Sequence, residues 1–170
     1  MPQKLNIGVH GFSGSGKSEV ARYLVSRHGF FHVSSGEICR SVSRLLFGSE
    51  EKGVLNTISA KMREIDESIW IEAALRSTKQ GPLIFDSLRY RSDAVFLRER
   101  GFQLWTIDCP PNICADRLRR RGQDFSFADF SHASEVELRL FPFDVRIDNS
   151  GESLARLYTQ IDEAVGVRND

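Results

Sequence analysis

The clearest chemical signature in the sequence is the stretch GFSGSGKS at positions 11–18, which follows the apolar run LNIGV. In a G-x-x-x-x-G-K-S turn, backbone N–H groups can point at phosphate oxygens, Lys17 can reach the outer phosphates and Ser18 can hold Mg²⁺. An ordinary Gly/Ser turn between a strand and a helix is the alternative. The spacing favours a nucleoside triphosphate site. The predicted contacts in this loop are Gly11, Ser13, Gly14, Ser15, Gly16, Lys17 and Ser18.

A second group of charged residues follows the apolar run PLIFD, where Asp86 ends a predicted strand. Arg89 and Arg91 stand just beyond it. A carboxylate in this place can order Mg²⁺ and its water or accept a proton from a hydroxyl group, and fixed guanidinium groups can clamp a phosphate. The base-specifying N-K-x-D motif expected of a GTPase is missing from the sequence. The pattern favours a kinase whose acceptor is itself a phosphate ester.

The segment HVSSGEICRSV, residues 32–42, is the third candidate part of the site. It ends a predicted strand and opens a helix at Ser34 or Ser35, and Arg40 follows one turn later. A helix N-cap and a surface arginine are the plainer interpretation. With Arg89 close by, an acceptor-phosphate site that includes Ser35 and Arg40 becomes more plausible.

These residues need a scaffold, and the sequence alternates apolar runs of strand length with segments of helical period. This alternation predicts an α/β protein: a three-layer sandwich in which helices cover both faces of a five-stranded parallel sheet. The two tryptophans, Trp70 and Trp105, are expected in the core. The predicted strands are LNIGV, FFHVS, PLIFD, FQLWTI and FDVRID.

Two segments are longer than a simple alternation of strands and helices requires. Residues from 36 to about 80 offer two or more helices, with an apolar stripe that is expected to be buried. Residues from 119 to about 135, RRRGQDFSFADFSHASE, are polar with interspersed Phe and are a candidate mobile lid. Both should lie over the edge of the sheet where the strands end, which is the ligand-binding edge of such folds. The stripe consists of Leu55, Ile58, Met62, Ile65 and Ile69.

Composition narrows the class of protein. The 170 residues suit one domain spanning residues 1–170, with equal counts of 23 basic and 23 acidic residues. Balanced charge gives no indication of a nucleic acid or an anionic membrane as partner. The three cysteines form no C-x-x-C pair, and no apolar run approaches the roughly 20 residues that span a bilayer. We expect a soluble, cytoplasmic monomer or homodimer that binds a small molecule.

GFSGSGKS, VSSGEICR and FDSLR resemble the P-loop, the monophosphate motif and the D-G-x-x-R segment of adenylate-kinase-like nucleoside monophosphate kinases. The second half is more similar to phage-type deoxynucleoside monophosphate kinases, with their short lid, T/S-E-x-x-L segment and strand ending in N-x-G. Dephospho-CoA kinases, phosphomevalonate kinases and an archaeal group of P-loop kinases share much of this layout. The residues that match the second half are Ser134, Glu135, Leu138, Asn149 and Gly151.

This resemblance implies roles for particular residues. The P-loop would bind the ATP phosphates, with Asn149 near the adenine, and Ser18 and Asp86 would hold Mg²⁺. Ser35 and Arg40 would bind the acceptor phosphate. The resemblance also implies arginines that clamp the acceptor phosphate and lid arginines that neutralise charge during transfer. The lid arginines equally suit the solvated C-terminal end of a helix. The clamps are Arg89 and Arg91, and the lid arginines are Arg117, Arg120 and Arg121.

The sequence departs from the family pattern at two places. Many relatives carry an arginine in the second half of the lid, where this chain has His132, Ala133 and Ser134, and Asp86 is not followed by glycine. The implied activity is transfer of the γ-phosphoryl group of Mg-ATP to a nucleoside monophosphate, plausibly a deoxynucleotide, with Lys17, Asp86 and Arg89 in catalysis. The alternatives are a dephospho-CoA kinase, with Asp86 as base, and an ATP-binding regulator with little turnover.

Overall fold

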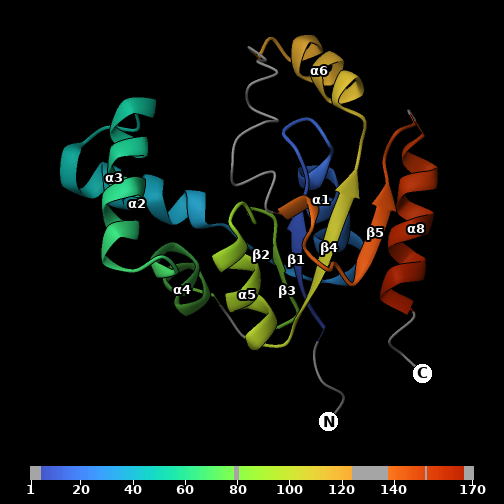
Figure 1. Ribbon diagram of the computed structural model, residues 1–170, viewed down its shortest axis with the longest axis horizontal. Helices are drawn as coiled ribbons and strands as arrows, with labels where there is room; N and C mark the ends of the chain where they lie inside the picture. Colours follow the sequence, from blue (N-terminus) through green and yellow to red (C-terminus); the bar gives the residue numbers. More distant parts are fainter. Residues whose placement is uncertain (1–4, 79–80, 124–137, 152, 167–170) are drawn as a thin grey trace.

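A computed structural model describes residues 5–78, 81–123, 138–151 and 153–166, and its centre is a five-stranded sheet (Figure 1). All adjacent strands pair in parallel, in the order β2-β3-β1-β4-β5. The predicted α/β fold with five parallel strands is confirmed. The strands are β1 (Asn6–His10), β2 (Phe31–Val33), β3 (Leu83–Phe85), β4 (Phe102–Asp108) and β5 (Val145–Asp148).

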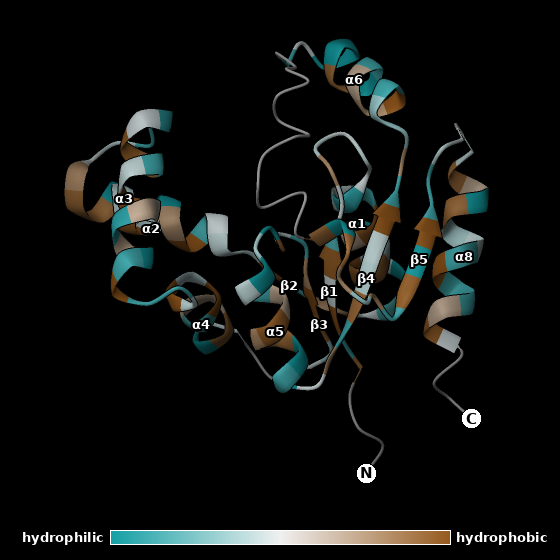
Figure 2. Cartoon of the chain, viewed as in Figure 1, coloured by the Kyte–Doolittle hydropathy of each residue, from teal (hydrophilic) through white to brown (hydrophobic). Residues whose placement is uncertain are grey.

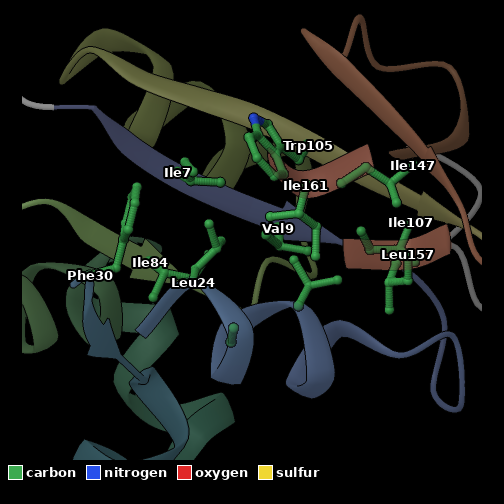
Figure 3. Close-up of a cluster of buried hydrophobic side chains, with 12 residues drawn as sticks. Ile7, Val9, Leu24, Phe30, Ile84, Trp105, Ile107, Ile147, Leu157 and Ile161 are labelled. Carbon is green, nitrogen blue, oxygen red and sulfur yellow. The ribbon is translucent and has the colours of Figure 1, made fainter. Parts of the chain in front are cut away.

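Helices cover both faces of the sheet because successive strand residues point to opposite sides. On one face, α1 (Lys17–His28) and α8 (Leu154–Gly166) contribute Leu24 and Leu157 to the same buried cluster as Trp105 of β4 (Figure 3). On the other face, α5 (Arg91–Glu99) packs Leu97 against Leu104 and Phe85. The apolar residues are concentrated in the strands and on the inner helix faces (Figure 2).

Three helices between β2 and β3 form an insertion beside the sheet (Figure 1). They bury a small core of Cys39, Ile58 and Trp70. The predicted extra helices and the burial of Trp70 are confirmed. The expectation for Ile65 is wrong, because this last residue of α3 is 76% exposed. The helices are α2 (Ser35–Phe47), α3 (Lys52–Ile65) and α4 (Ile69–Arg76).

A further helix, α6 (Pro111–Arg120), follows β4 and lies beyond the carboxyl ends of the strands (Figure 1). The predicted lid begins at its last turn, but most of that lid lies outside the described residues, together with His132, Ser134 and Glu135. Among the described helices, none has the length and apolar character needed to cross a membrane.

Candidate functional site

The glycine-rich loop connects β1 to α1 in a conformation that only glycine adopts without strain. Gly14 has φ of 82° and Gly16, the N-cap of α1, has φ of 102°. A Cβ atom on Gly14 would lie 2.5 Å from the Cys114 carbonyl oxygen, and one on Gly16 would lie 2.3 Å from Asn149 Nδ2. The loop therefore fits closely between α6 and the residue that follows β5.

Polar groups of the loop and its neighbours fix this conformation. Asn149 is buried and its Nδ2 donates to the Ser15 carbonyl oxygen at 2.6 Å. Lys17 Nζ donates to the carbonyl oxygens of Gly11 and, at 2.9 Å, Phe12, so the ammonium group lies across the start of the loop. Ser15 Oγ is a buried hydroxyl for which the described part of the chain supplies no hydrogen-bond partner. Ser13 and Ser18, in contrast, are exposed.

One hollow lies beside this loop and has a volume of about 450 Å³; we call it the loop hollow. Arg117 is held at its edge, since Nη2 donates to the Gly151 carbonyl oxygen at 2.7 Å and Nη1 lies 3.4 Å from Cys109 Sγ. The three arginines predicted for the lid thus gather on the same side of the loop as Asn149. Residues lining the loop hollow include Gly14, Gly16, Arg117, Arg120, Arg121 and Asn149.

A second hollow, of about 290 Å³, lies where the insertion meets the segment after β3; we call it the insertion hollow. It brings together three residues predicted to hold an acceptor phosphate, although Arg40 also pairs with Glu37. Ser34 is the N-cap of α2, and its Oγ accepts from the Glu37 amide at 3.4 Å, which leaves Ser35 at the first helical position. Residues lining the insertion hollow include Ser35, Arg40, Arg63, Trp70, Arg89 and Tyr90.

Arg91 is not brought to this group. It begins α5, and its guanidinium carbon lies 5.6 Å above the centroid of the Phe141 ring. The structure therefore separates the two arginines of the SLRYR segment, with Arg89 at the insertion hollow and Arg91 against residues that precede β5. Its predicted contact with the acceptor remains a prediction.

Comparison with known proteins supplies the family. A family model described as AAA domain matches residues 7–130. This range includes the glycine-rich loop and the three segments that carry Arg40, Arg89 and Arg117. The chain belongs to this AAA domain family. The matched region includes the insertion and β1 to β4, except the first residue of β1, and it ends before β5.

Full-length relatives of this AAA domain protein are distant. A protein of Acanthamoeba polyphaga mimivirus with the name "Putative deoxynucleotide monophosphate kinase" is 23% identical over 194 residues, covering 91% of this chain and 93% of its own length. A shikimate kinase from Bacteroides thetaiotaomicron superposes with a TM-score of 0.70 at 13% identity, covering 96% of this chain and 97% of its own. A gluconokinase from Sinorhizobium meliloti 1021 gives 0.62 at 19% identity, covering 99% and 100%. The predicted P-loop kinase fold, and the resemblance to nucleoside monophosphate kinases, are confirmed.

Asp86 of this AAA domain protein immediately follows β3, the strand beside β1, and its carboxylate is held by neighbours. His32 Nε2 lies 2.9 Å from Asp86 Oδ1, and Ser87 Oγ donates to the same oxygen at 3.1 Å. Burial alone would raise the pKa of Asp86, but these two hydrogen bonds and the charge of Lys17 outweigh it, and the pKa is lowered. In turn, the hydrogen bond to Asp86 raises the pKa of His32. Asp86 is therefore a stable anion and a weak base.

The residues predicted to bind Mg²⁺ have suitable chemistry. The Asp86 carboxylate and the exposed hydroxyl of Ser18, one residue into α1, are hard oxygen donors of the kind Mg²⁺ prefers. One or two protein oxygens completed by water and phosphate is the usual arrangement for Mg²⁺ beside a nucleotide. The pair therefore fits a Mg²⁺ ion shared with a bound triphosphate.

Sequence reasoning left three nearby residues without a role. The side chain of His32, in β2, is 43% exposed. It contacts Asp86, which follows the neighbouring strand β3. Asp93 is almost fully buried in the first turn of α5 and pairs with Arg63 of α3. A charged residue within an otherwise apolar helical face, as at Asp93, is the one signal in the sequence that could have indicated this pair.

His10 lies immediately before the loop and predicts a pH dependence of stability. Its ring is buried, stacks on Phe143 at 5.4 Å, and has Nδ1 3.4 Å from the Leu88 carbonyl oxygen. Burial lowers the pKa of His10 to about 4. Because the unfolded chain binds this proton at higher pH, with an ordinary histidine pKa near 6.5, the folded state loses stability as pH falls from 6.5 towards 4.

We expect His10 to contribute about 2 kcal/mol to the fall in unfolding free energy between pH 7 and pH 5. Urea denaturation of the wild type and His10→Asn at both pH values measures this contribution. In His10→Asn, the unfolding free energy should fall between pH 7 and pH 5 by about 2 kcal/mol less than in the wild type, whatever the absolute stability of the variant. Equal pH differences in the two proteins would mean that His10 accepts its proton as readily when folded as when unfolded.

Proposed function

We propose that the protein transfers the γ-phosphoryl group of Mg-ATP to the phosphate of a nucleoside or deoxynucleoside monophosphate. The observation that carries this proposal is the insertion hollow, in which two guanidinium groups, Arg40 and Arg89, border one small cavity. Guanidinium groups in this arrangement suit a dianionic phosphate, and the aromatic and apolar side chains beside them suit a base. The Bacteroides and Sinorhizobium proteins are named for acceptors that are phosphorylated on hydroxyl groups, so fold alone does not choose the acceptor.

On the donor side, the loop amides and Lys17 would hold the triphosphate, and the loop hollow would take the rest of the nucleotide. Ser18 and Asp86 would hold Mg²⁺, which when bound neutralises charge on the outer phosphates. Arg117 stands at the mouth of the loop hollow, where it would contact the nucleotide. Arg120 and Arg121, at the end of the same helix, would add positive charge on that side.

The low pKa of Asp86 supports a phosphate acceptor over a hydroxyl acceptor. A hydroxyl group must lose its proton to a base, and a carboxylate whose pKa is lowered accepts that proton less readily. A phosphate monoester, with its second pKa near 6, carries an ionised oxygen at neutral pH. That oxygen would form its bond to the γ-phosphorus as the bond to the β–γ bridging oxygen breaks, giving ADP and a nucleoside diphosphate. Asp86 would then serve the metal and need not act as base.

A panel of acceptors tests this proposal. The protein is incubated with Mg-ATP and each of the common ribo- and deoxyribonucleoside monophosphates, dephospho-CoA, shikimate and gluconate, and ADP release is followed by a coupled assay. We expect ADP release that depends on a monophosphate, with the diphosphate product identified by ³¹P NMR. Turnover with dephospho-CoA alone would replace the proposal by its hydroxyl-acceptor alternative. Tight ATP binding without turnover of any acceptor would indicate a regulator.

A further inference from the structure

An ion pair ties the insertion to the core beside the insertion hollow. Arg63 of α3 donates from Nη2 to both carboxylate oxygens of Asp93 on α5, at 2.9 and 3.2 Å. The Asp93 side chain is 2% exposed and that of Arg63 is 18% exposed. The second guanidinium nitrogen, Nη1, donates to the Glu67 carbonyl oxygen at 2.8 Å, just past the end of α3. Both terminal nitrogens of the Arg63 guanidinium group are therefore hydrogen-bonded.

The same carboxylate holds the backbone of the segment that carries Arg89. Asp93 Oδ2 accepts a hydrogen bond at 3.3 Å from the Tyr90 amide, which belongs to the peptide group that joins Arg89 to Tyr90. The Arg63 guanidinium lies over the Tyr90 ring, 4.0 Å from its centroid. Tyr90 and Arg89 both line the insertion hollow, as does Arg63 itself. One buried anion thus links α3, the first turn of α5 and a predicted phosphate clamp.

We propose that Arg63 and Asp93 are positioning residues that fix Arg89 relative to the insertion, and so set the geometry of the acceptor site. This inference rests on the proposed function for its effect on catalysis. A buried carboxylate needs partners, and here they come from α3 of the insertion and from the segment after β3, both of which line the insertion hollow. Any displacement of α3 relative to α5 must break these bonds or carry Arg89 along with it.

The pair should act on the acceptor more than on ATP. The loop hollow lies on another side of the glycine-rich loop, and its lining includes neither Arg63 nor Asp93. The Arg89 guanidinium group must meet the acceptor phosphate in one orientation. A small misplacement of this group therefore weakens the interaction with the acceptor. We therefore expect Arg63→Met to raise the acceptor KM roughly tenfold and the ATP KM less than twofold. Arg63→Lys, which keeps the charge but loses the fork, should recover part of the loss.

A matched control exists on the same face of the insertion. Glu72 of α4 pairs with Arg100, at the end of α5, at 3.7 Å. This second ion pair also joins the insertion to the α5 region but does not border the insertion hollow. Glu72→Gln should therefore leave both KM values within twofold of the wild type. A matching rise in acceptor KM in Glu72→Gln would overturn the inference, because general loosening of the insertion would then be sufficient.

A readout independent of turnover separates this inference from the proposed function. Amide hydrogen exchange is measured for Arg89 and Tyr90 in the wild type, Arg63→Met, Asp93→Asn, the double variant Arg63→Met/Asp93→Asn and Glu72→Gln. We expect faster exchange at these two amides in the first three variants and unchanged exchange in Glu72→Gln. If Asp93→Asn does not fold, Arg63→Met and Arg63→Lys carry the test. Unchanged exchange in folded Arg63→Met would overturn the inference, whereas absence of monophosphate turnover in the wild type would overturn only the proposed function.

Discussion

The variant Lys17→Ala is expected to lose about 10²- to 10³-fold in kcat for phosphoryl transfer. Lys17 begins α1, and its ammonium group is held over the loop by the carbonyl oxygens of Gly11 and Phe12. This places a positive charge next to the position proposed for the outer phosphates, where negative charge must be stabilised during transfer. Alanine removes that charge without filling its place. Turnover at saturating Mg-ATP and acceptor measures the loss.

The control for Lys17 is Lys61→Ala on α3. Lys61 is 69% exposed and pairs with Glu64 on the same helix, so its removal should leave kcat within twofold of the wild type. Because Lys17 also links two loop carbonyls, thermal unfolding of both variants is recorded to separate lost catalysis from lost structure. If folded Lys17→Ala keeps the wild-type kcat, the loop does not hold the reacting triphosphate and the proposed donor site is wrong.

The scaffold of this site could be predicted because its three central strands, β1, β3 and β4, are buried along most of their length. Parallel strands covered by helices on both sides read as short continuous apolar runs, and the five predicted runs correspond to the five strands. The glycine-rich loop and Asp86 then follow, because the carboxyl ends of parallel strands share one edge. The failure at Ile65 has a local cause. Ile65 is the last residue of α3, and the stripe continues only at Ile69, which begins the next helix, α4.

The arrangement around the site depends on contacts that local sequence patterns do not encode. His32 and Asp86 are brought together by pairing of β2 with β3, and Arg63 and Asp93 by packing of the insertion against α5. Arg91 and Arg89 are two residues apart and have equal chemistry in the sequence. What separates them is Phe141, which lies 50 positions further along the chain and packs under Arg91. Such distinctions require the folded chain.

The second large effect is expected for Arg89→Ala, which should lower kcat/KM for the acceptor about 10²- to 10⁴-fold. A guanidinium group that donates two hydrogen bonds to a phosphate contributes roughly 1.5–3 kcal/mol for each bond to a charged group, and 1.36 kcal/mol corresponds to tenfold. Arg89 lines the insertion hollow together with Arg40, and the amide of the next residue, Tyr90, donates to Asp93. Steady-state kinetics with the best acceptor of the panel measure this effect, and the ATP KM should change less than threefold.

Two other arginines make this prediction specific. Arg76→Ala removes an exposed arginine of α4 that pairs with Glu72, and we expect it to leave kcat/KM within twofold. Arg91→Ala should reduce kcat/KM far less than Arg89→Ala, because Arg91 lies against Phe141 and away from the insertion hollow. Equal losses at the two positions would place the acceptor phosphate between them, over the start of α5. A folded Arg89→Ala protein with wild-type acceptor kinetics would remove the phosphate clamp from the site, and with it the main reason for preferring a monophosphate acceptor to a hydroxyl acceptor.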